Sequence, residues 1–203
     1  MTKNISPPSE YPKVPAEITK RLLELHGKVR SQSASDWNGT FPIPPAIERF
    51  YREVGPFEVT IAAYGNPYFL PSLAGLWEFQ AGYRWNGLNG EPIEDWLDDW
   101  LVVADEGGDP FIFSRSSGVI LHAYHGEGKW NAHEIFPDLN TMAACLAQLG
   151  AIVIEAGDDD MLDEDTGTVA TRYKELASTR LQELLGSEST AKAVLGALGW
   201  DWA

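Results

Sequence analysis

Apolar residues recur at helical spacing in the first quarter of the chain. Pro15 suits a first helical turn, and an apolar stripe follows it on one side. The stripe consists of Ile18, Leu22, Leu25 and Val29. We therefore predict a helix from Pro15 to about Arg30. A second helix is predicted from the Pro44–Pro45 pair to Gly55, because Ile47, Phe50, Tyr51 and Val54 share one face.

The middle of the chain changes to the short apolar runs that are typical of strands. The run at 59–63 is separated from the run at 68–70 by a turn sequence, Gly65–Asn66–Pro67. Residues 100–125 form the clearest β unit, with turns at 106–109 and 114–118. Short strands joined by tight turns predict an antiparallel meander. Between these units, Ser72 is predicted to cap a short helix that carries Leu73, Leu76 and Trp77.

Helical periodicity returns near the C-terminus. Asp138 or Asn140 can cap a helix whose inner side carries Leu139, Met142, Leu146 and Leu149. Residues 152–154 either continue that helix or form a short strand. Two more helices are predicted over about 169–184 and 191–198, and we expect Trp200 and Trp202 to pack on the domain.

The predicted class is α+β: an antiparallel meander flanked by N-terminal helices and one later helix, with a C-terminal helical extension. We divide the chain into a flexible leader (1–14), an α+β domain (15–155), and an acidic connector with a helical extension (156–203).

Composition and length limit the class of protein further. The chain has 203 residues, of which 44% are hydrophobic, and this suits a folded domain with a proper core. Its single cysteine, Cys145, excludes an internal disulfide and a multi-cysteine zinc site. The first residues lack the apolar core of a signal peptide, and the longest weakly polar stretch, 141–154, is too short to span a bilayer. We expect a cytoplasmic protein that is a monomer or a weak homodimer.

Charge is distributed unevenly along the chain. Thirty acidic and 15 basic residues give a net charge of −15. Residues 91–165 alone hold 18 acids and two bases, Arg115 and Lys129, a balance of −16. Such a surface repels phosphates, so we expect neither nucleic-acid nor membrane binding.

Tryptophans are interleaved with the first acidic cluster. Carboxylates beside tryptophan can bind Arg and Lys side chains, as in a protein-binding hot spot. We therefore predict that this segment binds a basic protein, although a merely solubilising face is the alternative. The candidate partner-binding residues are Glu94, Asp95, Trp96, Asp98, Asp99, Trp100, Asp105 and Glu106.

Motifs for catalysis or metal binding are weak. His122 and His125 are an odd number of residues apart, which places them on opposite faces of a strand. The acidic run 158–167 does not match the calcium loop of an EF-hand. We expect no cofactor, no metal site and no catalytic residue. Gly107, Gly108 and Asp109 are predicted as a structural turn, wet and unperturbed, which Asp109 ties through its own backbone.

Three segments together resemble a known family. They are the proline-led helix that ends in glycine (43–55), the run 100–113 with its glycine–glycine–aspartate turn, and the strand 118–124. Over about residues 16–150 the order of these features resembles the SUKH superfamily, which includes the Smi/Knr cell-wall-assembly regulators. The resemblance implies a non-catalytic binding domain. Bacterial members are immunity proteins that bind and block one toxin domain, often a nuclease, and fungal members are regulatory hubs.

We therefore expect an immunity protein that neutralises a cognate toxin, or another basic protein, through an acidic tryptophan-bearing face. Two alternatives stay open. One is a regulatory scaffold that neutralises no toxin, and the other is an enzyme that uses the carboxylates between Glu106 and Glu127.

Overall fold

A computed structural model describes residues 12–157 and 161–200. One antiparallel sheet runs in chain order through β1 (Val59–Ile61), β2 (Tyr68–Leu70), β3 (Trp100–Glu106), β4 (Asp109–Ser114), β5 (Ile120–His122) and β6 (His133–Phe136). The helices that precede and follow it are α1 (Ala16–Leu23), α2 (Pro45–Glu53), α3 (Leu139–Ala156), α4 (Thr171–Leu185) and α5 (Glu188–Ala197). The predicted α+β class and antiparallel meander are confirmed.

The β3–β4 hairpin turns over two glycines. Glu106 pairs with Asp109, so Gly107 and Gly108 form a two-residue loop, and their φ angles are +61° and +107°. Positive φ at both positions matches the strand twist and favours glycine. A Cβ on Gly107 would lie 2.3 Å from Nδ2 of Asn66, so close packing also requires glycine there. The predicted structural turn is present.

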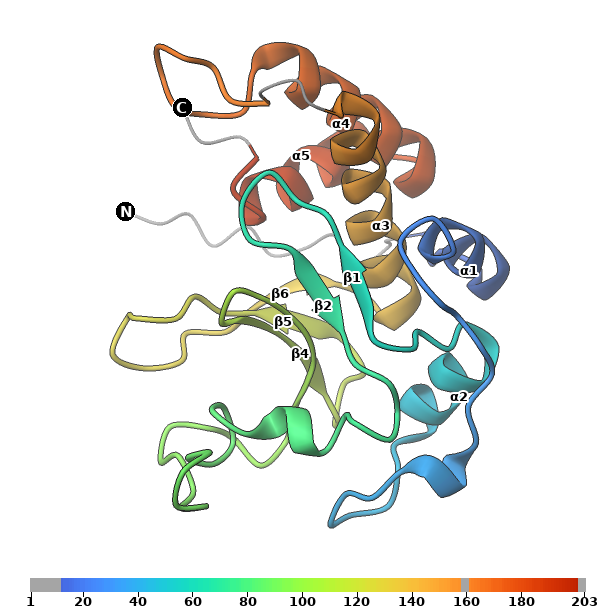
Figure 1. Ribbon diagram of the computed structural model, residues 1–203, viewed down its shortest axis with the longest axis vertical. Coiled ribbons are helices and arrows are strands. Elements are labelled where there is room, and N and C mark those ends of the chain that lie inside the picture. The colour runs from blue at the N-terminus through green and yellow to red at the C-terminus, as the bar shows by residue number, and fades with distance from the viewer. Residues whose placement is uncertain (1–11, 158–160, 201–203) are drawn as a thin grey trace.

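The two faces of the sheet are covered differently. One face packs against α3 and the N- and C-terminal helices in the main hydrophobic core. The other face carries Val102 and Ile112 and is covered by a smaller aromatic cluster that includes Tyr83, Trp96 and Trp100. In Figure 1, the green segment between β2 and β3 lies below the sheet, whereas α4 and α5 lie above it.

Two predicted helices are shorter than their sequence patterns indicate. The first ends at Leu23, and Leu25 is 62% exposed, because residues near Val29 instead form a bridge with Pro56. The helix expected at 73–77 is a series of turns leading to a 3-10 helix, Glu78–Gln80. Here the Gln80 amide donates to the carbonyl of Val102 and fixes the segment on β3. By contrast, α3 continues through residues 152–154 as a helix.

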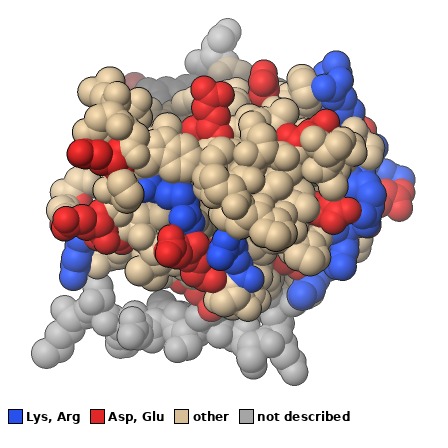
Figure 2. Space-filling view, turned by 90° about the horizontal axis from the view of Figure 1, so that it is seen from below, with Lys and Arg blue, Asp and Glu red and all other residues tan. Residues whose placement is uncertain are grey.

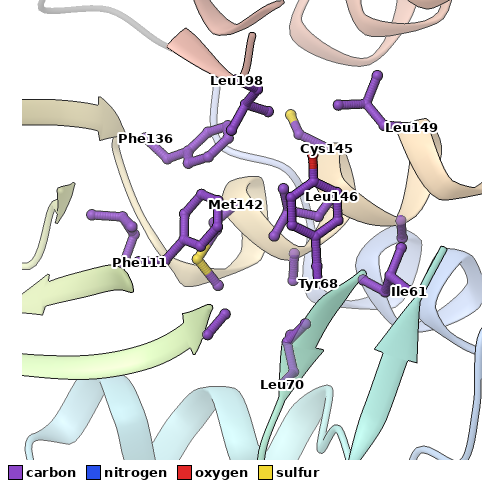
Figure 3. Packing of buried hydrophobic residues seen from close by; sticks show 14 of the residues in the cluster. Ile61, Tyr68, Leu70, Phe111, Phe136, Met142, Cys145, Leu146, Leu149 and Leu198 are labelled. Atoms are coloured by element: carbon purple, nitrogen blue, oxygen red, sulfur yellow. The ribbon is translucent and has the colours of Figure 1, made fainter. Parts of the chain in front are cut away.

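The C-terminal helices belong to the main core. Leu181, Leu195 and Leu198 are buried in the same cluster as α3 and the sheet, and Figure 3 shows Leu198 beside Phe136 and Cys145. Trp200 is 1% exposed and packs edge-on against Tyr64, with ring centroids 5.4 Å apart. The expected packing of Trp200 is therefore confirmed, while Trp202 lies outside the described residues.

The expected leader and connector are only partly described. Residues 1–11 lie outside the described residues, but the backbone N–H of Val14 donates to Oγ1 of Thr141 and its side chain is buried. A flexible leader extending to residue 14 is therefore wrong at Val14. Residues 158–160 of the acidic connector also lie outside the described residues, and Met161 beyond them is buried in the core.

Helix α3 is longer than the weakly polar stretch 141–154, which the sequence analysis judged too short to span a bilayer. With 18 residues it is long and apolar enough to cross a membrane, but 67% of it is buried inside the fold. That burial is what the central helix of a globular core requires.

Candidate protein-binding site

Several carboxylates of the predicted binding segment hold the fold together. Asp99 accepts hydrogen bonds from the Ser114 hydroxyl (2.7 Å) and from the Ser116 backbone N–H (2.8 Å), which fixes the turn between β4 and β5. Asp95 accepts from the backbone N–H of Trp130 at 2.8 Å. Both carboxylates therefore position loops, and Asp95 is also exposed.

Glu94 and Asp98 are the acids of this segment that remain most available. Both are exposed. Asp98 pairs with Arg84 at 3.2 Å, although the Asp98 side chain is fully in water. Only the Asp98 side of this pair is exposed, because the Arg84 side chain is 16% exposed and also donates to two backbone carbonyls.

The expectation that Trp96 and Trp100 project from the acidic face is wrong. Their exposed fractions are 7% and 9%, and their rings pack edge-on with centroids 5.3 Å apart. Trp96 also contacts Tyr83 and Trp130, at 5.9 and 5.7 Å. The tryptophans share one cluster with Val102 and Ile112 and so help to cover the outer face of β3 and β4.

Charge on the lower face is mixed. Figure 2 shows acidic and basic side chains interspersed on one part of this face, beside a broad uncharged area. Arg84 precedes the acidic segment in the chain but lies against it, because its guanidinium donates to the carbonyls of Asp98 and Trp100 at 2.7 Å each. The acidic segment is therefore not a uniform anionic patch.

The strand register separates the last two predicted site residues, Asp105 and Glu106. Asp105 pairs with Phe69 of β2, whereas Glu106 pairs with Tyr68 of β2 and Asp109 of β4. Directly paired residues share a face and successive residues alternate, so the two carboxyls lie on opposite faces of the sheet. Each of them lines a different cavity.

Asp105 lines an open groove of about 460 Å³ on the face that carries the aromatic cluster. Three aromatic side chains and three carboxylates take part in its lining, together with smaller residues. The aromatic side chains are those of Phe69, Phe79 and Tyr83, and the carboxylates are those of Glu58, Glu78 and Asp105. We call this cavity the aromatic groove. The Tyr83 hydroxyl donates to Asp105 at 2.9 Å.

Glu106 lines a smaller cavity of about 100 Å³ on the opposite face, which we call the Glu106 cavity. The C-terminal segment forms part of its wall through Leu198 and Gly199. Its other lining residues are Tyr64, Asn66, Asp109, His122 and Tyr124. The hydroxyls of Tyr64 and Tyr124 donate to the carbonyls of Gly199 and Ala197, both at 2.9 Å, and so hold this segment in place.

Burial perturbs two titratable groups of the Glu106 cavity in particular, Glu106 and His122. Burial, with the charges of Asp109 and Asp105, raises the pKa of Glu106 to about 7. Burial also lowers the pKa of His122 to about 4. Among the described residues, neither ring nitrogen of His122 has a hydrogen-bond partner, and the side chain is 1% exposed. The prediction of a wet, unperturbed turn at 106–109 is therefore wrong for Glu106.

Asp109 has a different role from the one predicted. Its Oδ1 accepts from the backbone N–H of His125 at 2.7 Å and lies 2.6 Å from Nδ1 of the same residue. Asp109 therefore ties the chain after β5 to the β3–β4 hairpin, rather than closing its own turn. Within residues 12–157 and 161–200, no group of three His, Cys, Asp or Glu side chains is placed to hold a metal ion.

The groove and cavity contain residues that the sequence analysis did not select. Glu58, Phe69, Glu78, Phe79 and Tyr83 come from three segments that are separate in the chain, so no local motif marks them. The alternation of Ala104, Asp105 and Glu106 along a strand was an available signal that the two acids face different ways. Comparison with protein-family models, curated proteins and solved structures finds no match for this chain.

Proposed function

We propose that this protein is a non-catalytic binding domain that neutralises a cognate toxin by binding a basic surface of it. The groove side of the sheet supports this proposal most directly. There, exposed carboxylates of the 91–99 segment accompany an open groove lined by three aromatic rings and three carboxylates. The resemblance to the SUKH superfamily supports a toxin as the partner.

The tryptophans contribute to this function indirectly. Trp96 packs against Tyr83, and Tyr83 lines the aromatic groove. The aromatic cluster therefore acts as a support beneath the binding surface, which the partner contacts through the carboxylates and the less buried rings of Phe69 and Phe79. Because the support is rigid, less conformational entropy is lost when the partner binds.

Co-expression with the protein encoded by the neighbouring gene tests this function. We expect the neighbour alone to arrest growth, and growth to be restored when this protein forms a complex with it. Glu94→Lys with Asp98→Lys is expected to slow association and weaken its salt dependence. Glu24→Lys, a single exposed reversal at the end of α1, is the control for reversal elsewhere on the surface and is compared with Glu94→Lys and Asp98→Lys made one at a time; it leaves binding unchanged.

The outcomes separate the alternatives. A stable complex with a cellular protein, with no toxicity to relieve, supports a regulatory scaffold instead. The absence of any complex with the neighbour's product contradicts toxin neutralisation. Binding that is indifferent to salt and to both reversals contradicts the electrostatic part of the proposal.

A carboxylate-dependent enzyme is the second candidate, and the Glu106 cavity is the observation that favours it. A carboxyl group with a pKa near 7 is suited to proton transfer at neutral pH. The cavity of about 100 Å³ has room only for a very small substrate. Titration of the protein with small polar fragments, followed by the NMR signals of Glu106 and His122, tests this candidate. Fragment binding there supports it, and its absence contradicts it.

A further inference from the structure

We infer that the aromatic groove is an anchor site for an arginine side chain of the basic protein partner. This inference deepens the proposed function and rests on it. The groove lies between the segment that leads into β1, the segment around the 3-10 helix Glu78–Gln80, and the end of β3. It is therefore assembled only in the folded protein.

The charge of the groove selects a cation. Glu58, Glu78 and Asp105 all line it, and no basic residue does. Within the described part of the chain, none of these three carboxylates has a basic group within ion-pair distance. The nearby Lys28 and Arg30 lie over the Phe57 ring, at 5.5 and 3.7 Å from its centroid, and not in the groove. The negative charge is therefore left for a partner to neutralise.

The aromatic lining selects arginine among the possible cations. Phe69 and Phe79 are only half-buried, and their ring centroids are 5.5 Å apart. A planar guanidinium stacks on ring faces and still donates to carboxylates at its edge, whereas an ammonium group is compact and more strongly hydrated. An arginine stem can also cover the apolar part of the groove.

The volume is consistent with a protein-borne side chain. The groove volume of about 460 Å³ is larger than the volume of one arginine side chain. Residues of the partner that flank the arginine can therefore enter the groove with it. Tyr83 is held on both sides, by its hydrogen bond to Asp105 and by contacts with Phe79, Trp96 and Trp130. The wall is thus formed before the partner arrives, which favours binding.

NMR titration of the isotope-labelled protein with three matched peptides tests the site without the partner. The probes are acetyl-Gly-Arg-Gly-amide, the same peptide with lysine, and the same peptide with citrulline, which is nearly isosteric with arginine but uncharged. We expect the arginine peptide to shift the amides of residues 69–83 and 105 and to bind more tightly than the lysine peptide. The citrulline peptide is expected not to bind.

Matched variants locate the interaction. Glu78→Gln and Phe79→Ala are each expected to weaken arginine-peptide binding about two- to fivefold, the size of one exposed ion pair or cation–π contact. Glu24→Gln, at an exposed residue just after α1, makes the same charge change away from the groove and is expected to leave peptide binding unchanged. Equal binding of the citrulline peptide, or equal effects of Glu78→Gln and Glu24→Gln, would overturn the inference.

Failure of this inference is distinguishable from failure of the proposed function. If the toxin is neutralised but Glu78→Gln and Phe79→Ala leave both the toxin and peptide affinities unchanged, the groove is not the anchor site and the proposed function stands. If the arginine peptide binds in the groove but no toxin is neutralised, the cation site stands and the proposed function fails.

Discussion

Asp105 and Glu106 are neighbours in the chain, but their carboxyls lie on opposite faces of the sheet. Asp105 accepts a hydrogen bond from Tyr83 beside an open groove, whereas Glu106 pairs with Tyr68 and lies in a cavity that the C-terminal segment helps to close. One strand end thus supplies one carboxylate to the aromatic groove and another to the Glu106 cavity. The two acids are consequently expected to respond differently to mutation and to pH.

Glu106→Gln is expected to stabilise the protein at high pH. The folded-state pKa of Glu106 is about 7, above the ordinary value of 4.5, so the folded protein retains a proton that the unfolded chain has lost. Stability from this group is therefore lost as pH rises from about 4.5 through 7. We expect the variant to exceed the natural protein by about 1–3 kcal/mol in the free energy of unfolding at pH 8, and by less at pH 5.5. Urea unfolding followed by tryptophan fluorescence measures this. Glu94→Gln is the exposed control, and a gain that does not change with pH would contradict the prediction.

His122→Phe is expected to remove a source of acid sensitivity. The pKa of His122 is about 4 in the folded protein and near 6.5 in the unfolded chain, so the unfolded chain takes up the proton first as pH falls. The natural protein therefore loses stability from pH 6.5 down to 4. Phenylalanine keeps the ring contacts with Phe111 and Tyr124, at 4.7 and 4.9 Å, without titrating.

Unfolding of this variant and the natural protein is compared at pH 7.5 and pH 4. The difference at pH 7.5, where the imidazole is neutral in both states, gives the packing effect alone. As pH falls from 7.5 to 4, we expect the free energy of unfolding of the variant to rise by about 1–3 kcal/mol relative to that of the natural protein. Parallel pH profiles would show that protonation of His122 does not limit stability.

Trp96→Ala is expected to lower the stability of the fold, and to affect binding only as a consequence. The side chain is 7% exposed and its Nε1–H donates to the Trp100 carbonyl at 3.4 Å. Loss of a buried indole costs about 3–5 kcal/mol in the free energy of unfolding. Leu97→Ala, at a neighbouring residue that is 53% exposed, is the control and should change it by less than about 0.5 kcal/mol. Unchanged stability together with lost partner binding would restore the sequence-based interpretation of Trp96 as an exposed anchor.

Glu58 provides a test that separates backbone strain from charge. Its φ is +56°, a left-handed conformation that costs a non-glycine residue about 1 kcal/mol. Glu58→Gly should therefore raise the free energy of unfolding by about 0.5–1 kcal/mol, while Glu58→Gln should leave it unchanged. Both variants remove the same carboxylate and should weaken arginine-peptide binding equally. Thermal unfolding and the NMR titration measure the two effects, and equal stability of the variants would contradict the strain.

Two helical glycines are expected to respond in opposite directions to alanine. A Cβ on Gly150 of α3 would lie 2.3 Å from Cγ2 of Ile61 and 2.9 Å from the Ala62 carbonyl oxygen. Gly150→Ala should therefore cost about 1–3 kcal/mol through overpacking, despite the better helix propensity of alanine. A Cβ on Gly196 of α5 meets nothing within 4 Å, so Gly196→Ala should gain up to about 1 kcal/mol. Denaturant unfolding measures both, and a stabilising Gly150→Ala would refute the close contact between α3 and β1.

Local patterns predicted the elements well where they determine structure by themselves. Short apolar runs and the Gly107–Gly108 turn were sufficient for the meander, because antiparallel strands need only a tight turn between them. Helix lengths were predicted less well. Leu25 continues the apolar stripe of α1 but is 62% exposed, since the chain there leaves the helix to pair near β1. Tertiary pairing overrides helical periodicity at such a position.

The amino-acid sequence by itself determined the α+β class, the antiparallel meander of the first five strands and the excess of acidic charge, since these depend on composition and on spacing within short segments, whereas β6 was not predicted. Only the tertiary structure decided which carboxylates line the aromatic groove, which line the Glu106 cavity and which hold loops in place. The aromatic cluster and the two cavities join residues far apart in the chain, so the burial of Trp96 and Trp100 and the separation of Asp105 from Glu106 arise when those segments pack. Burial and electrostatic environment are properties of the packed chain. Acidic side chains that look alike in the sequence therefore line a groove at one position, line a cavity at another and hold a loop by hydrogen bonds at a third.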